Sequence, residues 1–190
     1  SAPCALPRPL DYMAREAREI LPAVLAATGV GRHVLIGHSD GATISAHRAA
    51  ADAPGLEGLV LIAPHFFVED ISIQSIEAAG EAFETGDLRE RLARHHDHPA
   101  IAFRGWNDAW LDPGFRDWDI TGVIDEWQVP CLALQGTDDP YGTRAQVDVI
   151  RERRTDAEVV LLDGLGHAPH LEAPDTCLDL IAAFLGRLAP

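Results

Sequence analysis

Ser39 lies in a short pattern whose residue types suit a nucleophile. The segment GHSDG, residues 37–41, follows an apolar, β-branched run at 33–36 and precedes an alanine-rich stretch, so a strand is expected before it and a helix after it. Glycines on both sides would let strand and helix approach closely around a strained serine. The backbone N–H of Asp40, at the start of the helix, would then face a developing oxyanion. A strand that ends in a flexible turn is the other interpretation of this segment.

A serine hydroxyl needs a base and a group that orients the base, and both residue types occur further along the chain. The segment QGTDDPYG holds Asp138 and Asp139 after a later apolar run, and DGLGHAPHLEAP holds His167 after the next one. His170 follows His167 by three residues. Loops after the carboxyl ends of parallel strands converge on one sheet edge. Each residue alone could be an ordinary polar loop residue, but their order and positions together favour a Ser-His-Asp triad with Ser39.

The elements that must position these residues alternate between strand and helix. Helical spacing predicts a first helix at 11–28, and short apolar runs predict strands at 33–36, 58–64, 129–136 and 157–164. Further helices are expected at 41–53, 143–154 and 174–188. This alternation predicts an α/β fold with a mostly parallel sheet flanked by helices.

Residues 66–127 interrupt this alternation and are predicted to form several short helices. They hold all four tryptophans and five of the six phenylalanines. An insertion on the carboxyl side of a strand predicts an active-site lid, in which Trp106 and Trp110 would bind substrate in an apolar pocket. Alternatively, the rings form the insertion's own small core. We therefore predict a core domain from 1–65 and 128–190, with a helical domain inserted at 66–127.

The segments GHSDG, QGTDDP and GLGHAPHLEAP together resemble the α/β-hydrolase superfamily, in its esterase, lactonase and C–C hydrolase branch. The resemblance covers about residues 10 to 190. It implies the α/β-hydrolase fold, a cap formed by the insertion, and a triad of Ser39, Asp139 and His167. Asp139 is selected over Asp138 because the family's acid lies three residues after the glycine, here Gly136.

Family members usually carry further strands before the helix that precedes the nucleophile, and a loop there supplies a second oxyanion N–H. The chain starts just before that helix, so the resemblance implies an N-terminally truncated version of the fold. The strand at 33–36 would then be an exposed apolar sheet edge. We expect a preceding segment of a longer chain, or another copy in a homo-oligomer, to cover that edge.

Composition excludes several classes of partner. The formal net charge of −15 and the pI of about 4.8 argue against nucleic acid and anionic membrane surfaces. No apolar stretch is long enough to cross a bilayer, and three widely spaced cysteines without a CxxC pair suggest reduced thiols in the cytoplasm. In RHHDHP, residues 94–99, adjacent histidines would point apart, so we expect no metal site there.

These observations predict a serine hydrolase that acts on a small or medium ester, lactone or related acyl substrate, with no cofactor. A small-molecule substrate is the only ligand that the sequence implies. C–C bond hydrolysis, or cofactor-free haloperoxidase-like chemistry on the same triad, is the alternative within enzymes. A non-catalytic binding module is the alternative outside them.

Overall fold

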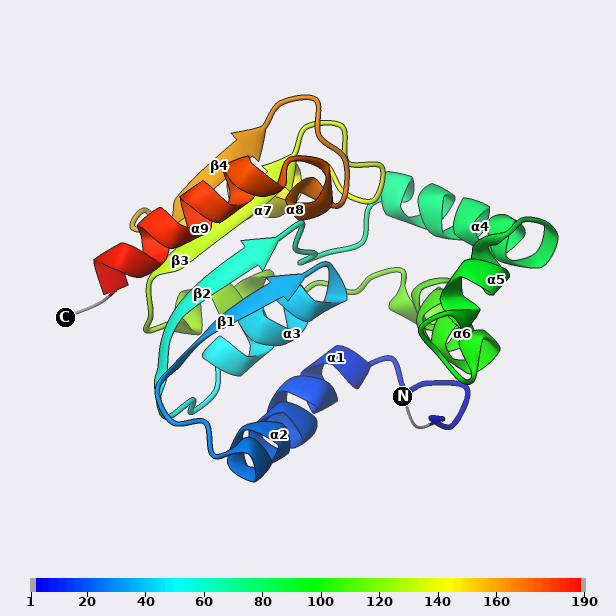
Figure 1. The fold of residues 1–190 in the computed structure, drawn as a ribbon, viewed down its shortest axis with the longest axis horizontal. Coiled ribbons are helices and arrows are strands. Elements are labelled where there is room, and N and C mark those ends of the chain that lie inside the picture. The colour runs from blue at the N-terminus through cyan, green and yellow to red at the C-terminus, as the bar shows by residue number, and fades with distance from the viewer. Residues whose placement is uncertain (1–2, 189–190) are drawn as a thin grey trace. The chain divides into compact units, whose positions relative to one another are not determined.

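The computed structural model describes residues 3–188, which form two compact units (Figure 1). The first unit joins the N-terminal residues up to Tyr12 to Val68–Trp118. The second unit joins Met13–Phe67 to the residues from Asp119 onward and contains the sheet. The long middle segment of the chain therefore contributes mainly to a unit of its own.

The sheet of the second unit has four parallel strands in the order in which they occur along the chain. They are β1 (His33–His38), β2 (Leu56–Ile62), β3 (Cys131–Gly136) and β4 (Glu158–Leu162). In register, His38 of β1 pairs with Ile62 of β2, and Gly136 of β3 pairs with Leu162 of β4. The loops that follow β1, β3 and β4 therefore all leave the sheet at the carboxyl ends of its strands.

The strands occur where the apolar runs predict them, with ends that differ by one to two residues. β2 begins and ends earlier than expected because Gly55 and Ala63, at its two ends, take left-handed backbone conformations with φ of 83° and 47°. β3 begins only after Pro130, which has no N–H to donate to a sheet. Backbone conformation, rather than hydrophobicity, therefore sets the ends of β2 and the start of β3.

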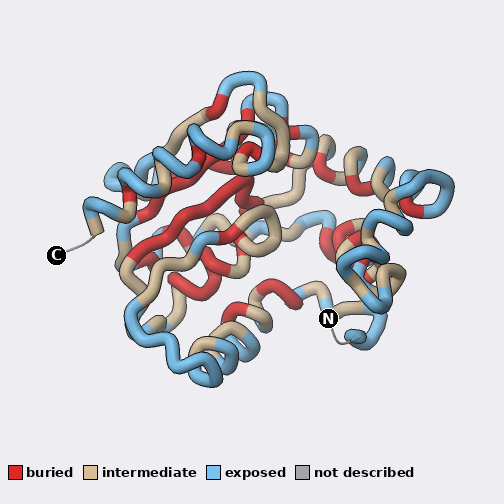
Figure 2. Tube along the Cα trace, in the orientation of Figure 1, coloured by how far each residue is buried: buried red, intermediate tan, exposed pale blue. Residues whose placement is uncertain are grey.

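Helices cover both faces of the sheet. One face carries α3 (Asp40–Ala49), α7 (Ala145–Arg153) and the 3-10 turn η3 (Thr121–Glu126). The other face carries α9 (Pro174–Leu188), whose Cys177 and Phe184 pack against apolar residues of β2, β3 and β4. The short helix α8 (Pro169–Glu172) precedes α9. β3 is buried along its whole length, and Figure 2 shows the same of most of β2.

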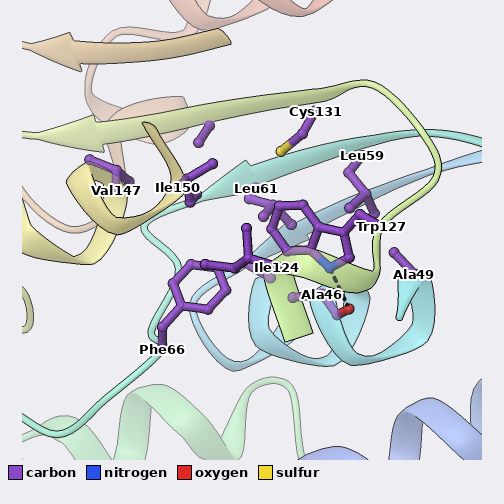
Figure 3. Packing of buried hydrophobic residues seen from close by; sticks show 12 residues of the cluster. Ala46, Ala49, Leu59, Leu61, Phe66, Ile124, Trp127, Cys131, Val147 and Ile150 are labelled. Carbon is purple, nitrogen blue, oxygen red and sulfur yellow. Dashed lines mark hydrogen bonds between the residues drawn. The ribbon is translucent and has the colours of Figure 1, made fainter. Parts of the chain in front are cut away.

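The larger core cluster lies between β2, β3 and the α3 face (Figure 3). Trp127 closes this cluster, and its indole Nε1 donates a hydrogen bond of 3.0 Å to the carbonyl of Ala46. Phe66 and Ile124 are also completely buried here. Residues at both ends of the predicted insertion thus pack in the core of the sheet-bearing unit.

The predicted first helix is present but is not uniform. α1 (Tyr12–Arg15) runs into a π-helical turn, η1 (Glu16–Ile20), and then into α2 (Leu21–Thr28). Gly29 ends it in a left-handed conformation with φ of 68°. The π-helical turn packs against α3, which positions the helix beside the segment that follows Ser39.

The first unit is helical and has an aromatic core of its own. It contains α4 (Asp70–Thr85), α5 (Leu88–Ala93), α6 (Pro99–Trp110) and the 3-10 turn η2 (Pro113–Phe115). Phe83 and Phe103 stack with centroids 4.1 Å apart, and Trp110 packs edge-on against Phe115 and Trp118. Many of the rings therefore stabilise this unit, and its action as a cap stays a prediction.

β1 is the first strand in the sheet order, and Ile36 on it is 52% exposed. The other residues of the strand are half-buried, except for Gly37, which is buried. No helix among residues 3–188 has both the length and the apolar composition needed to cross a membrane.

Candidate active site

Ser39 occupies a strained turn between β1 and α3. Its φ of 55° and ψ of −125° lie in a region that residues with a side chain rarely adopt, at a cost of about 1–3 kcal/mol. Its N–H donates to the carbonyl of Ile62 at 2.9 Å, and its own carbonyl accepts from the N–H groups of Ala42 and Thr43. The turn is therefore held both by β2 and by the first turn of α3.

Glycine is required on only one side of Ser39. A Cβ atom at Gly37 would lie 2.2 Å from the carbonyl oxygen of Gly41, so the close approach of strand and helix depends on a glycine at 37. A Cβ atom at Gly41 would meet no atom within 4 Å. The expectation that glycine is needed at both positions is therefore wrong for Gly41. Gly41 takes part in the close approach through its backbone carbonyl, and a side chain at position 41 would point away from Gly37.

The structure brings Ser39, His167 and Asp139 into one hydrogen-bonded chain. His167 Nε2 lies 2.9 Å from Ser39 Oγ, and His167 Nδ1 lies 2.9 Å from Asp139 Oδ2 and 3.0 Å from Oδ1. The Asp139 side chain is completely buried and that of His167 is 18% exposed. Because a carboxylate only accepts, Nδ1 carries the proton and Nε2 is left to accept the hydroxyl of Ser39. This is the arrangement of nucleophile, base and orienting acid that acyl transfer requires.

Asp139 is held in its charged form. Burial by itself would raise the pKa of this carboxyl, but hydrogen bonds from His167 and from the backbone N–H of Tyr141, the latter at 2.8 Å, outweigh burial and lower the pKa below its usual value. Gln135 Nε2 donates a further hydrogen bond of 2.7 Å to Oδ2. An ionised Asp139 can stabilise the imidazolium that forms when His167 accepts a proton.

The neighbouring residues of the same types lie elsewhere. Asp138 is exposed, and its carboxylate accepts a long hydrogen bond of 3.4 Å from Thr137. The ring of His170 packs edge-on against His38, with centroids 4.6 Å apart. The fold thus places His167 next to Ser39 and Asp139 next to His167, rather than these neighbours.

Two residues to which we assigned no role from the sequence hold the loop of His167. The Glu172 carboxylate accepts the N–H groups of Gly166 at 2.8 Å and Ala168 at 3.2 Å, on either side of His167. His38 Nε2 donates to the carbonyl of His167 at 2.7 Å. Both residues lie inside the quoted motifs, but only the folded loop gives them a partner.

Two further histidines near the triad are neutral. Burial lowers the pKa of His65 to about 3, and its ring centroid lies 5.8 Å from that of His167. Burial also lowers the pKa of His38, although the carbonyl of His167 partly opposes this. Because neither ring is charged at neutral pH, neither competes with His167 for the negative charge of Asp139.

The other predicted site residues have clear structural positions. Asp40 is the first residue of α3, directly after Ser39, where helix N–H groups are available to an anion. Trp106 is half-buried beside Phe103 on α6. Trp110 is 2% exposed, and its Nε1 donates to the hydroxyl of Tyr12 at 3.1 Å. The roles of Asp40 in oxyanion binding and of both tryptophans in substrate binding stay predictions.

The first unit also contains a cavity of about 250 Å³, to which Trp110 contributes. Its other lining residues are Ile73, Glu77, Leu111, Asp112, Pro113 and Arg116. Arg116 forms an ion pair with Asp70, and Asp112 caps η2 through the N–H of Gly114, so some of the polar groups at this cavity already have structural partners.

Among residues 3–188, including the histidines at 95–98, no three or more His, Cys, Asp or Glu side chains are grouped so that they could hold a metal ion. All three cysteines are free. Burial raises the pKa of the Cys131 thiol to about 12, so this thiol is neither a metal-binding nor a nucleophilic thiolate.

Comparison with known proteins decides the family. The sequence matches the model of the alpha/beta hydrolase family over residues 3–180. The chain belongs to the alpha/beta hydrolase family. This agrees with the parallel sheet, the turn at Ser39 and the order of serine, aspartate and histidine along the chain.

Curated relatives and solved structures of alpha/beta hydrolases resemble much of the chain. LipZ of Mycobacterium tuberculosis, which is designated a hydrolase, is 28% identical over 88% of this chain and 70% of its own length. N-formylmaleamate deformylase of Pseudomonas putida is 25% identical over 83% of this chain and 65% of its own length. An esterase of a Rhodococcus species superposes with a TM-score of 0.69 at 20% identity, covering 98% of this chain and 76% of the esterase. Family membership and these relatives support a hydrolase activity.

Proposed function

We propose that this alpha/beta hydrolase is a serine hydrolase that cleaves a small or medium ester, lactone or related acyl substrate. The observation that carries the proposal is the unbroken hydrogen-bond chain from buried Asp139 through His167 to Ser39. It supports a nucleophilic role for Ser39, because a serine hydroxyl becomes reactive only beside an oriented base.

The mechanism follows from the proton positions. Ser39 Oγ attacks the substrate carbonyl carbon while His167 Nε2 takes the hydroxyl proton, and the imidazolium then delivers that proton to the leaving group. Asp139 keeps the proton on Nδ1 and stabilises the imidazolium. The backbone N–H of Asp40 donates to the oxyanion, and a water molecule activated by His167 then releases the acyl group from Ser39.

The names of the relatives support an acyl carbonyl as the group attacked. One relative is named as an esterase and another as a deformylase, and both reactions pass through a tetrahedral intermediate at a carbonyl carbon.

The decisive test is covalent labelling of Ser39 by a fluorophosphonate probe, followed by a panel of p-nitrophenyl esters, a lactone and an N-formyl amide. We expect labelling of the wild-type chain and none of Ser39→Ala. Asp139→Asn should lower kcat by roughly three to four orders of magnitude, because the carboxamide favours the wrong imidazole tautomer. Asp138→Asn is the matched control, since it changes the adjacent exposed carboxylate and should leave kcat unchanged.

An inert Ser39 in the folded protein would refute the proposal and favour a binding module. Hydrolysis of a dienoic diketone, without hydrolysis of any ester, would instead support C–C bond cleavage on the same three residues.

A further inference from the structure

Gln135 is a buried polar residue in an otherwise apolar strand. It is the second-to-last residue of β3, and it is 1% exposed. Cys131 and Ala133, which lie on the same face of the strand as Gln135, belong to the apolar core cluster. A polar side chain at such a position costs free energy unless its hydrogen-bonding groups find partners.

Its amide nitrogen has two partners, and both belong to the loop that carries Asp139. Gln135 Nε2 donates to Asp139 Oδ2 at 2.7 Å and to the carbonyl oxygen of Gly142 at 3.2 Å. The opposite amide orientation would place Oε1 against a carboxylate and a carbonyl, which only accept. The chemistry of the two partners therefore determines which end of the amide faces Asp139.

The amide oxygen, in contrast, is buried and has no hydrogen-bond partner among the described residues. An unsatisfied buried acceptor costs about 1–3 kcal/mol, a cost that an apolar side chain of similar size would avoid. The hydrogen bond to Asp139 is what glutamine offers here and what an apolar residue would not.

We propose that Gln135 is a positioning residue that clamps the Asp139 carboxylate against His167. Tyr141 N–H holds Oδ1 and Gln135 holds Oδ2, so the carboxylate cannot rotate about its bond to Cβ. The second donation, to Gly142, ties the end of the loop to β3. This inference rests on the proposed function, since positioning Asp139 matters only if His167 acts as a base.

Replacing Gln135 by glutamate tests this contact, because the new carboxyl group would lie against the Asp139 carboxylate. The titratable groups that interact with Asp139 are His167 after β4, His65 after β2, His38 at the end of β1 and Tyr141 in its own loop. Glutamate in place of Gln135 could keep the 2.7 Å contact only as the neutral acid, donating its O–H to Oδ2. Two carboxyl groups this close share one proton, so the introduced acid would ionise at an unusually high pH.

The experiment compares Gln135→Met, Gln135→Glu and the matched control Gln146→Met. Gln146 is also a fully buried glutamine, and its side chain forms hydrogen bonds with the backbone of Phe66 and Phe67. Each protein is measured for kcat and KM on an ester that the wild type hydrolyses, as a function of pH. Proton NMR records the low-field signal of His167 Nδ1–H, which needs no turnover.

We expect Gln135→Met to lower kcat roughly 10- to 100-fold with little change in KM, since the carboxylate loses its fixed direction. The Nδ1–H signal should broaden or vanish. Gln146→Met should lower stability only, with kcat and the signal unchanged. Gln135→Glu should be active while the introduced acid is neutral and His167 is unprotonated, and it should lose activity as pH rises further and that acid ionises, a limb absent from the wild type.

Wild-type kcat and an unchanged Nδ1–H signal in Gln135→Met would overturn the inference, as would equal losses of kcat in Gln146→Met. If Gln135→Met does not fold, the pH limb of Gln135→Glu decides. A wild-type chain without activity or labelling would refute the proposed function instead, and the NMR comparison would still show whether Gln135 fixes the Asp139–His167 pair.

Discussion

Replacing Gly37 by alanine should damage both the fold and the reactivity of Ser39. The added Cβ would lie 2.2 Å from the carbonyl oxygen of Gly41, 2.5 Å from its carbonyl carbon and 2.6 Å from the nitrogen of Ala42. All three are backbone atoms, so no side-chain rotation can relieve the overlap. Restoring an ordinary contact requires β1 and the start of α3 to separate by roughly 1 Å.

The expected magnitude follows from that separation. Overpacking of this kind costs about 1–3 kcal/mol of unfolding free energy. Ser39 lies between the two segments that must separate, and its hydrogen bond to His167 is 2.9 Å long. A displacement of about 1 Å at a reacting group lowers rates about 100-fold.

Urea denaturation and the rate of fluorophosphonate labelling of Ser39 measure the two effects separately. Gly41→Ala is the matched control, because a Cβ there meets no atom within 4 Å and alanine is favoured over glycine in a helix. It should retain stability and labelling. Wild-type behaviour of Gly37→Ala, or equal losses in both variants, would refute the packing argument.

Two further predictions concern the loop of His167 and the response to acid. Glu172→Gln keeps one acceptor oxygen for the loop but turns an NH₂ group toward the other backbone N–H. It should therefore lower the free energy of unfolding by about 1 kcal/mol in urea denaturation, and in steady-state kinetics it should lower kcat more than it changes KM. An unchanged kcat would contradict this role of Glu172. Burial lowers the pKa of His47 to about 4 and that of His65 to about 3, so below about pH 6.5 the unfolded chain binds protons that the folded chain does not. Stability should therefore fall as pH drops from 6.5 to 4, by at most about 1.4 kcal/mol per pH unit for each ring, and His47→Gln should flatten the slope in urea denaturation. An equally steep slope in that variant would show that His47 is not buried in its neutral form.

Local pattern was sufficient to predict the sheet and the residues at its edge. Alternation of short apolar runs with amphipathic segments predicts parallel strands, and residues placed after strand ends must converge because parallel strands share one carboxyl edge. Ser39 and His167 could be chosen on this ground. The choice of Asp139 over Asp138 needed the family resemblance, because two adjacent aspartates have nearly the same position in a linear pattern.

Several features could be decided only by the tertiary structure, because they depend on distances between segments far apart in the chain. The aromatic residues of 66–127 divide between two cores, with Phe66 and Trp127 packing beside the sheet and most others in the helical unit. Glycine is needed at 37 but not at 41 because a Cβ atom would point at the neighbouring backbone at position 37 and into open space at position 41. The partners of Gln135 are a carboxylate and a carbonyl whose positions depend on how the loop after β3 folds back onto that strand. Composition and spacing determine which chemical groups reach the sheet edge, whereas the hydrogen bonds that orient them arise only when the loops close.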